Sequence, residues 1–344
     1  MAPIQPVPAR QPESFVEVRD LTVRFTSRDI DVAVVNGVSF SLAPGEVLCL
    51  LGESGSGKSV TMRALMRLLP DSARLGGSVR VGGTDILALP AQRLPEIRGS
   101  LISMIFQEPL TALDPVFTIG QQIAETVRCH EGLDRRAARR RALELLELVQ
   151  IPSAARRLDA YPHELSGGLR QRAMIALALS CRPRLLLADE PTTALDATVQ
   201  IQVLLLLREL QEQLGMATIF VTHDLGVACE VADKVAVMYA GRFVETAPIA
   251  DIMDAPQHPY TRGLLHSTVH GGRRDEDLRP VPGAPPDLAE LPPGCSFAPR
   301  CGYRQEACLA AMPPLAARGP DRAARCILDG DRLARAECAA VAAP

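Results

Sequence analysis

A glycine-rich loop early in the chain has the residue types and the spacing that bind phosphate groups. It lies between an apolar run and a segment with helical spacing, and it reads Gly52-Glu53-Ser54-Gly55-Ser56-Gly57-Lys58-Ser59. Glycines let the backbone wrap a polyphosphate with its N–H groups turned inward, and the start of a helix favours an anion. Lys58 would bring a positive charge to the β- and γ-phosphates, and the Ser59 hydroxyl could bind Mg²⁺. We expect this loop, with Val60 after it, to hold a polyphosphate.

Two carboxylates that follow a second apolar run, Leu185–Ala188, could complete this chemistry. Asp189 is placed to hold Mg²⁺, directly or through water, and Glu190 is placed to polarise an attacking water. Strands often end in acidic residues, so this pair alone is weak evidence for a magnesium site. It becomes strong evidence because a phosphate loop precedes it in the sequence.

The elements that must position these motifs follow an α/β pattern. Residues 15–42 hold two stretches that alternate apolar and polar side chains, which predicts antiparallel strands. Continuous apolar runs predict strands buried on both faces at residues 47–52, 185–189, 218–224 and 235–241. Helical patterns alternate with these runs, and the middle region is mostly helical. We therefore expect an α/β core with an antiparallel β subdomain, a helical subdomain and a small Cys-containing C-terminal extension.

Length and composition limit the possible classes of protein. The 344 residues suggest about two domains, and the net charge of −3 argues against a general nucleic-acid binder. No apolar run is long enough to span a membrane, and the N-terminus lacks the apolar centre of a signal peptide. We expect a flexible N-terminal lead-in at 1–13, the main domain at 14–262 and the extension at 263–344.

Nine cysteines divide into two groups. Four are scattered in apolar contexts and are interpreted as core residues: Cys49, Cys129, Cys181 and Cys229. Five lie in the last 50 residues, where Cys295, Cys301, Cys308 and Cys326 have spacings that suit a metal site. Four thiolates can hold a [4Fe–4S] cluster or a tetrahedral Zn²⁺. The spacing alone does not distinguish between the cluster, zinc and a site without metal. Cys338 lies outside this motif.

A third motif shows a family resemblance. Residues 165–171 read LSGGLRQ and precede the second apolar run. With the phosphate loop and the Asp189-Glu190 pair, this motif resembles the signature of the nucleotide-binding domain of ATP-binding cassette (ABC) proteins, which are P-loop ATPases. The resemblance implies that two such subunits face each other head to tail. Ser166, Gly167, Gly168 and Gln171 of one subunit would then grip the ATP on the phosphate loop of the other.

The same resemblance implies further roles. Gln107 matches the glutamine that contacts Mg²⁺ and the attacking water, and Asp196 matches the aspartate of the loop that crosses the dimer seam. His223 matches the switch histidine, which touches the γ-phosphate and Glu190. Phe25 matches the aromatic residue that stacks on adenine. The implied catalytic residues are thus Glu190, His223 and Gln107, and the implied Mg²⁺ ligands are Ser59, Gln107 and Asp189.

The C-terminal region resembles a narrower group. The segment HPYTRGLL at 258–265 and the four-cysteine spacing are similar to the tail of oligopeptide/dipeptide/nickel importer ATPases, and Val60-Thr61 resembles their D-type subunit. The resemblance implies a [4Fe–4S] cluster, with Zn²⁺ as the alternative. We expect a structural role for it, so that loss of the cluster would weaken complex assembly and leave the phosphate site itself intact. His258 is interpreted as a family marker and not as a metal ligand.

The implied function is ATP hydrolysis that drives import of peptides or related small solutes. Its partners would be a second, F-type ATPase subunit, two transmembrane permease subunits and, indirectly, an external solute-binding protein. No nucleic-acid partner is expected, and the subunit would lie at the cytoplasmic face of the cell membrane. The alternative is a soluble ABC ATPase that acts on nucleic acid or the ribosome.

Overall fold

The structure is a computed structural model that describes residues 14–28, 31–193, 195–267 and 280–330. Its strands are β1 (Val16–Thr26), β2 (Asp31–Leu42), β3 (Val47–Leu51), β4 (Ala73–Val81), β5 (Thr84–Asp85), β6 (Ile102–Ile105), β7 (Leu185–Asp189), β8 (Ala217–Thr222), β9 (Lys234–Tyr239), β10 (Arg242–Pro248), β11 (Ala316–Gly319) and β12 (Arg322–Ala324). Its α-helices are α1 (Lys58–Leu65), α2 (Leu94–Ile97), α3 (Pro109–Ala112), α4 (Ile119–Glu131), α5 (Arg135–Leu148), α6 (Ala154–Arg157), α7 (Gly167–Leu179), α8 (Ala197–Leu214), α9 (Leu225–Val231), α10 (Ile249–Asp254), α11 (Pro259–His266) and α12 (Glu306–Ala310). Single 3₁₀ turns lie at η1 (Ala91–Arg93), η2 (Pro162–Glu164) and η3 (Ala298–Arg300).

A four-stranded sheet of order β2-β1-β4-β5 holds the N-terminal strands. β1 pairs antiparallel with both β2 and β4, so Val16 lies opposite Leu42 on one side and Val81 on the other. This confirms the antiparallel strands predicted from the alternating pattern. The apolar face of this sheet packs with Met62 and Leu65 of α1 in one continuous core cluster.

The main sheet has eight strands in the order β11-β12-β10-β9-β3-β8-β7-β6. The five strands from β9 to β6 are parallel, whereas β10, β12 and β11 are antiparallel to their neighbours. All residues of β3, β7 and β8 are buried, as expected for parallel strands with both faces covered. The loops after β3, β6, β7 and β8 meet at the carboxyl edge of the sheet, where α/β proteins bind their ligands.

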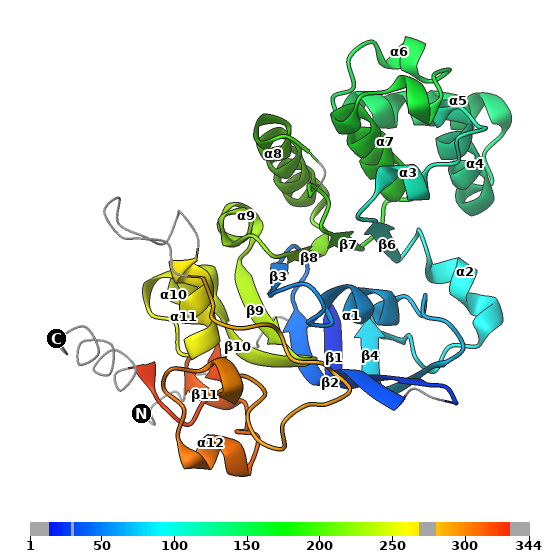
Figure 1. Ribbon diagram of the computed structural model, residues 1–344. Helices are drawn as coiled ribbons and strands as arrows, with labels where there is room; N and C mark the ends of the chain where they lie inside the picture. The colour runs from blue at the N-terminus through cyan, green and yellow to red at the C-terminus, as the bar shows by residue number, and fades with distance from the viewer. Residues whose placement is uncertain (1–13, 29–30, 194, 268–279, 331–344) are drawn as a thin grey trace, which may run out of the picture.

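Helices α3 to α7 form a group beyond strands β6 and β7 (Figure 1). α4 begins with a capping box between Thr118 and Gln121 and ends at Gly132, whose φ of 66° is left-handed. Leu145 and Leu146 of α5 are buried against α4 and α7 in the same core cluster. This is the helical subdomain that the sequence predicts.

The C-terminal segment continues the main sheet. β12 pairs with β10, with Glu245 opposite Ala324, and β11 pairs with β12. α11 runs across the predicted boundary at 262/263, which stays a prediction. Figure 1 shows this segment beside β10 and near α10 and α11. Among the described residues, no helix combines the length and the apolar character needed to cross a membrane.

The scattered cysteines do not all lie in the core. Cys49 and Cys181 are buried, as interpreted from their apolar contexts, but Cys129 and Cys229 are exposed. The interpretation is wrong for these two because an apolar neighbour in the sequence can point to the opposite side of a helix. Cys338 lies outside the described residues.

Candidate functional site

The phosphate loop joins β3 to α1, as the sequence predicts. Gly52 has a φ of 157°, and a Cβ atom there would lie 2.2 Å from the carbonyl oxygen of Met238. Gly57, just before α1, has a φ of 104°, and its Cβ atom would lie 2.8 Å from the carbonyl oxygen of Val34. Both positions require glycine because backbone of neighbouring strands comes so close.

Lys58 lies buried inside the loop. Its Nζ donates hydrogen bonds to the carbonyl oxygens of Gly52 and Glu53, at 2.7 and 2.9 Å. Burial lowers the pKa of Lys58, whereas the carboxylates of Glu190 and Asp189 act in the opposite direction. The ammonium group therefore both ties the loop together and supplies a desolvated positive charge to an anion.

Ser59 and Asp189 come together where α1 meets the end of β7. The Ser59 hydroxyl donates a 2.8 Å hydrogen bond to Oδ1 of Asp189. Burial raises the pKa of Asp189, and the bond from Ser59 partly offsets this. Oxygen ligands of this kind suit Mg²⁺. The buried hydroxyl of Ser56 has no hydrogen-bond partner among the described residues, as expected of a donor that is meant for a phosphate oxygen.

The three residues predicted to be catalytic meet at one carboxylate. Nε2 of Gln107 lies 3.4 Å from Oε2 of Glu190, and Nδ1 of His223 lies 3.4 Å from Oε1. Thr193, which sequence reasoning missed, donates a 2.8 Å hydrogen bond to Oε2 of Glu190. Glu190 itself has a left-handed φ of 45°, which is uncommon for residues other than glycine.

These residues line one open cleft with about 1630 Å³ of empty space. Its walls are Val34, Glu53, Ser54, Gly55, Ser56, Gly57, Lys58, Ser59, Val60, Gln107, Glu190, His223, Leu264, Ser267, Pro280, Val281 and Leu288. Phe25 is not among them: it lies partly buried in β1, paired with Val32 and packed against the core. Its predicted contact with adenine stays a prediction.

The signature motif lies on a different part of the surface. Ser166 is the N-cap of α7 and accepts a hydrogen bond from the backbone N–H of Leu169. Gly167 and Gln171 line a separate pocket that also includes Gln107. A Cβ atom on Gly168 would lie 2.6 Å from Cγ1 of Val199, so this position is closely packed against α8. Within one chain, therefore, the signature does not line the phosphate cleft.

Asp196 occupies the start of α8. Its carboxylate accepts a hydrogen bond from the backbone N–H of Val199 at 3.0 Å, which caps the helix. The side chain is exposed, so this capping role leaves it accessible to a facing surface. Its predicted place at a dimer seam is compatible with this position and stays a prediction.

The C-terminal segment contacts the phosphate loop directly. The guanidinium group of Arg300 forms a two-pronged ion pair with the carboxylate of Glu53, at 2.7 and 2.9 Å. The Tyr260 hydroxyl accepts the backbone N–H of Glu53 at 2.8 Å. The expectation that loss of the cluster leaves the phosphate site intact stays a prediction, and the contact between Glu53 and Arg300 was not foreseen. The sequence carried no signal for it, because Glu53 and Arg300 are 247 residues apart and only the fold joins them.

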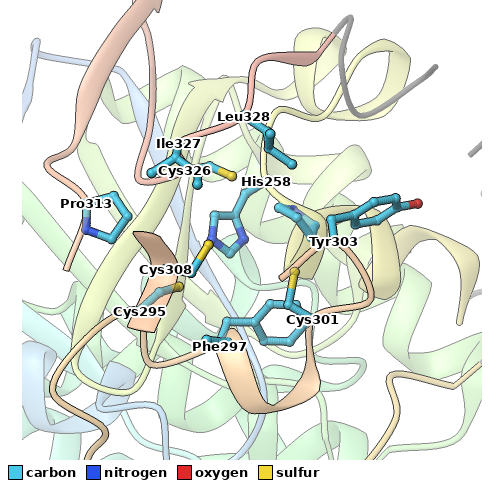
Figure 2. Close-up of a pocket in the computed structure, with 12 residues that line it drawn as sticks. His258, Cys295, Phe297, Cys301, Tyr303, Cys308, Pro313, Cys326, Ile327 and Leu328 are labelled. Carbon is cyan, nitrogen blue, oxygen red and sulfur yellow. The ribbon is translucent and has the colours of Figure 1, made fainter. Parts of the chain in front are cut away.

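The four C-terminal cysteines line one small cavity. Figure 2 shows them around His258, with Cys326 on the opposite side of the pocket from Cys301. His258 is buried, its Nδ1 accepts the backbone N–H of Tyr260, and burial lowers its pKa to about 3. The ring is therefore neutral, and its Nδ1 caps the start of α11. Its interpretation as a non-ligand stays a prediction.

The thiols of this cavity affect one another's pKa. The pKa of Cys301 is raised to about 11, mainly by burial and also by the other three thiols. Burial likewise raises the pKa of Cys295 and of Cys326. Three of the sulfurs each accept a hydrogen bond from the backbone N–H of the residue two positions later in the chain. These N–H groups belong to Phe297, Tyr303 and Leu328, which follow Cys295, Cys301 and Cys326. Hydrogen bonds of this kind stabilise thiolates, which metal ions and clusters require.

The cavity is nevertheless not arranged around a single metal ion. Among the residues that the structure describes, no three His, Cys, Asp or Glu side chains are close enough together to hold one. The donor chemistry fits a thiolate-bound group, but the described side chains are not arranged as a metal site.

Two family models match the sequence. Residues 35–193 match the ABC transporter family, and residues 244–308 match the C-terminal region of oligopeptide/dipeptide transporters. The fold agrees: a dimeric, post-hydrolysis structure of the ATP-binding cassette MJ0796 bound to ADP and Pi superposes with a TM-score of 0.61 at 28% identity, over 68% of this chain and 98% of that one. The cbiO1 protein of Clostridium perfringens, part of the ABC transporter complex cbiONQ, gives 0.60 at 26% identity, over 70% of this chain and 90% of that one.

Full-length relatives match as well. Two proteins, both named "Putative peptide import ATP-binding protein", come from Brucella melitensis biotype 1 and Brucella abortus strain 2308. The first is 49% identical over 93% of this chain and 98% of its own length, and the second is 51% identical over 94% and 96%. Neither family model and none of these relatives supports the alternative of an ATPase acting on nucleic acid or the ribosome. The chain belongs to the ATP-binding subunits of ABC transporters, in the branch with the oligopeptide/dipeptide-transporter C-terminal region, and it is an ATPase.

Proposed function

We propose that this subunit binds and hydrolyses ATP to power an importer of peptides, dipeptides or oligopeptides, or of related small solutes. The observation that carries the proposal is the joint presence, in one chain, of a phosphate cleft lined by Lys58, Gln107, Glu190 and His223 and of the transporter-specific C-terminal region. The names of the relatives support import of peptides. The solute itself would be selected by the permease and the external binding protein.

The cleft residues have distinct roles in this proposal. The loop from Gly52 to Ser59 holds the phosphates, and Lys58 supplies the positive charge. Ser59, Asp189 and Gln107 would hold Mg²⁺, which when bound offsets phosphate charge. Glu190 takes the proton of the attacking water, while Thr193 and Gln107 orient its carboxylate. His223 is more exposed than Glu190 and lies next to it, where it would contact the terminal phosphate.

The proposal requires a second ATPase subunit. Ser166, Gly167 and Gly168 do not line the phosphate cleft of their own chain, so they would complete the cleft of a partner. The dimeric state of the MJ0796 cassette supports such a pairing. We assign this chain as the D-type subunit paired with an F-type partner, and both would bind two permease subunits at the cytoplasmic face of the cell membrane.

Reconstitution tests the transport function. With its partner ATPase and two permease subunits in lipid vesicles, the protein should hydrolyse ATP faster when peptide-loaded binding protein is added, because solute delivery would close the ATPase dimer. ATP hydrolysis is measured by phosphate release, and uptake by labelled peptide. The same complex with Glu190→Gln is the control for background hydrolysis. Failure to co-purify with any permease would contradict the proposal.

We further propose that Cys295, Cys301, Cys308 and Cys326 hold a [4Fe–4S] cluster, with Zn²⁺ as the alternative. Their convergence on one cavity supports a thiolate-bound group, and the backbone N–H groups aimed at the sulfurs support deprotonated ligands. The group would supply cross-linking between chain segments, and we assign it no part in hydrolysis.

Metal analysis tests this site. Protein purified without oxygen should contain about four irons per chain and absorb broadly in the visible range. Cys301→Ser should lose most of this iron because one of four ligands is gone, whereas Cys129→Ser, at an exposed position far from the motif, should keep it. Stoichiometric zinc without iron or sulfide in the anaerobic preparation would rule out the cluster.

A further inference from the structure

Glu53, the second residue of the phosphate loop, is held by three different side chains. Its backbone N–H is bonded to the Tyr260 hydroxyl, its carbonyl oxygen accepts from Lys58, and its carboxylate is paired with Arg300. Two of these three partners, Tyr260 and Arg300, lie in residues 244–308, the part of the C-terminal segment that matches the oligopeptide/dipeptide-transporter region. The start of the loop is therefore held from outside the ATP-binding core.

Arg300 is fixed for this contact. Its side chain is only 5% exposed, whereas that of Glu53 is 27% exposed. Its Nε donates to the carbonyl oxygen of Pro282 at 2.7 Å, and its guanidinium group lies over the rings of Tyr239 and Phe297. A buried, preorganised guanidinium that meets a carboxylate with two bonds is the strongest form of this ion pair.

The charge of Glu53 makes this pairing important for nucleotide binding. Glu53 lines the phosphate cleft, and its carboxylate acts electrostatically on Lys58. An unpaired carboxylate there would repel a polyphosphate, and the open cleft does not screen it fully. Arg300 neutralises that charge and also fixes the position of the loop.

We propose that Arg300 and Tyr260 form a clamp on Glu53 through which the C-terminal segment sets the ATP affinity of the phosphate loop. This inference rests on the proposed use of the loop for ATP. Arg300 is a positioning residue, since it acts through Glu53. Because Cys301 follows it and Phe297 lines the cysteine cavity, the clamp joins the phosphate loop to the segment that carries the cysteines.

Titration calorimetry with ATP on the full chain tests the clamp. Arg300→Gln should bind ATP about tenfold more weakly, within the usual range of coupling between two sites. Glu53→Gln combined with Arg300→Gln should recover most of that loss, because the repelling charge is gone. A purely structural role for Arg300 predicts no such rescue. Arg304→Gln, at an exposed arginine of the same segment, is the matched control and should bind as the wild type does.

Tyr260→Phe provides a second, independent test, since it removes only the hydroxyl and keeps the packed ring. It should weaken ATP binding by about threefold, as expected for one lost neutral hydrogen bond. The proposal is overturned if Arg300→Gln and Tyr260→Phe both bind ATP as the wild type does, or if the double variant binds no better than Arg300→Gln. If Arg300→Gln does not fold, Tyr260→Phe alone decides. A wild type that fails to bind ATP would instead refute the proposed function.

Discussion

Replacement of Glu190 by glutamine should leave ATP binding intact and reduce hydrolysis by about 10²- to 10⁴-fold, the usual contribution of a general base. The amide is nearly the same size and can still accept the hydrogen bond from Thr193. It has no basic oxygen to take a proton from water. The variant should therefore also accumulate as an ATP-bound dimer, which size-exclusion chromatography with and without ATP would detect.

The position of the carboxylate makes this test specific. Glu190 is the residue on which Gln107, Thr193 and His223 converge. Among the described residues, the other carboxylate that lines the cleft is that of Glu53, which is paired with Arg300. Glu147→Gln, at an exposed position of α5, controls for the loss of one negative charge. If Glu190→Gln hydrolyses ATP within about threefold of the wild type, Glu190 is not the base.

Replacement of Lys58 by alanine should weaken nucleotide binding itself. A hydrogen bond to a charged group contributes about 1.5–3 kcal/mol, so the loss of this donor should raise the Kd for ATP by about 10- to 100-fold. The Nζ atom also joins the carbonyl oxygens of Gly52 and Glu53, so its removal loosens the loop as well. Titration calorimetry measures the Kd directly.

The chain has one other lysine, which provides the control. Lys234 pairs with Glu46 at 2.7 Å and does not line the cleft, so Lys234→Ala should leave the Kd for ATP unchanged. Mg²⁺ dependence should persist in Lys58→Ala because Ser59 and Asp189 remain. Equal ATP affinity in Lys58→Ala and the wild type would refute the assignment of the phosphate loop.

Local motifs were readable from the sequence because their chemistry lies within short, contiguous segments. The phosphate loop, the Asp189-Glu190 pair and the signature at 166–168 each need only a strand end or a helix start, and alternating or continuous apolar patterns predict those elements. For the same reason the α/β fold and its antiparallel and helical subdomains were predictable. The contact of His223 with Glu190 followed from the family resemblance, and the geometry agrees with it. The approach of Gln107 to Glu190 was seen only in the structure.

Contacts between distant segments were decided only by the tertiary structure. No local pattern marks Tyr260 or Arg300 as partners of Glu53, because a buried ion pair depends on how two surfaces meet after the sheet has formed. The prediction that Cys129 and Cys229 are buried was wrong for the same reason, because both side chains are exposed in the folded chain. The sequence alone thus determined the fold class, the phosphate loop and its carboxylates. The packing of the C-terminal segment against that loop needed the folded chain, because side chains 247 residues apart meet only there.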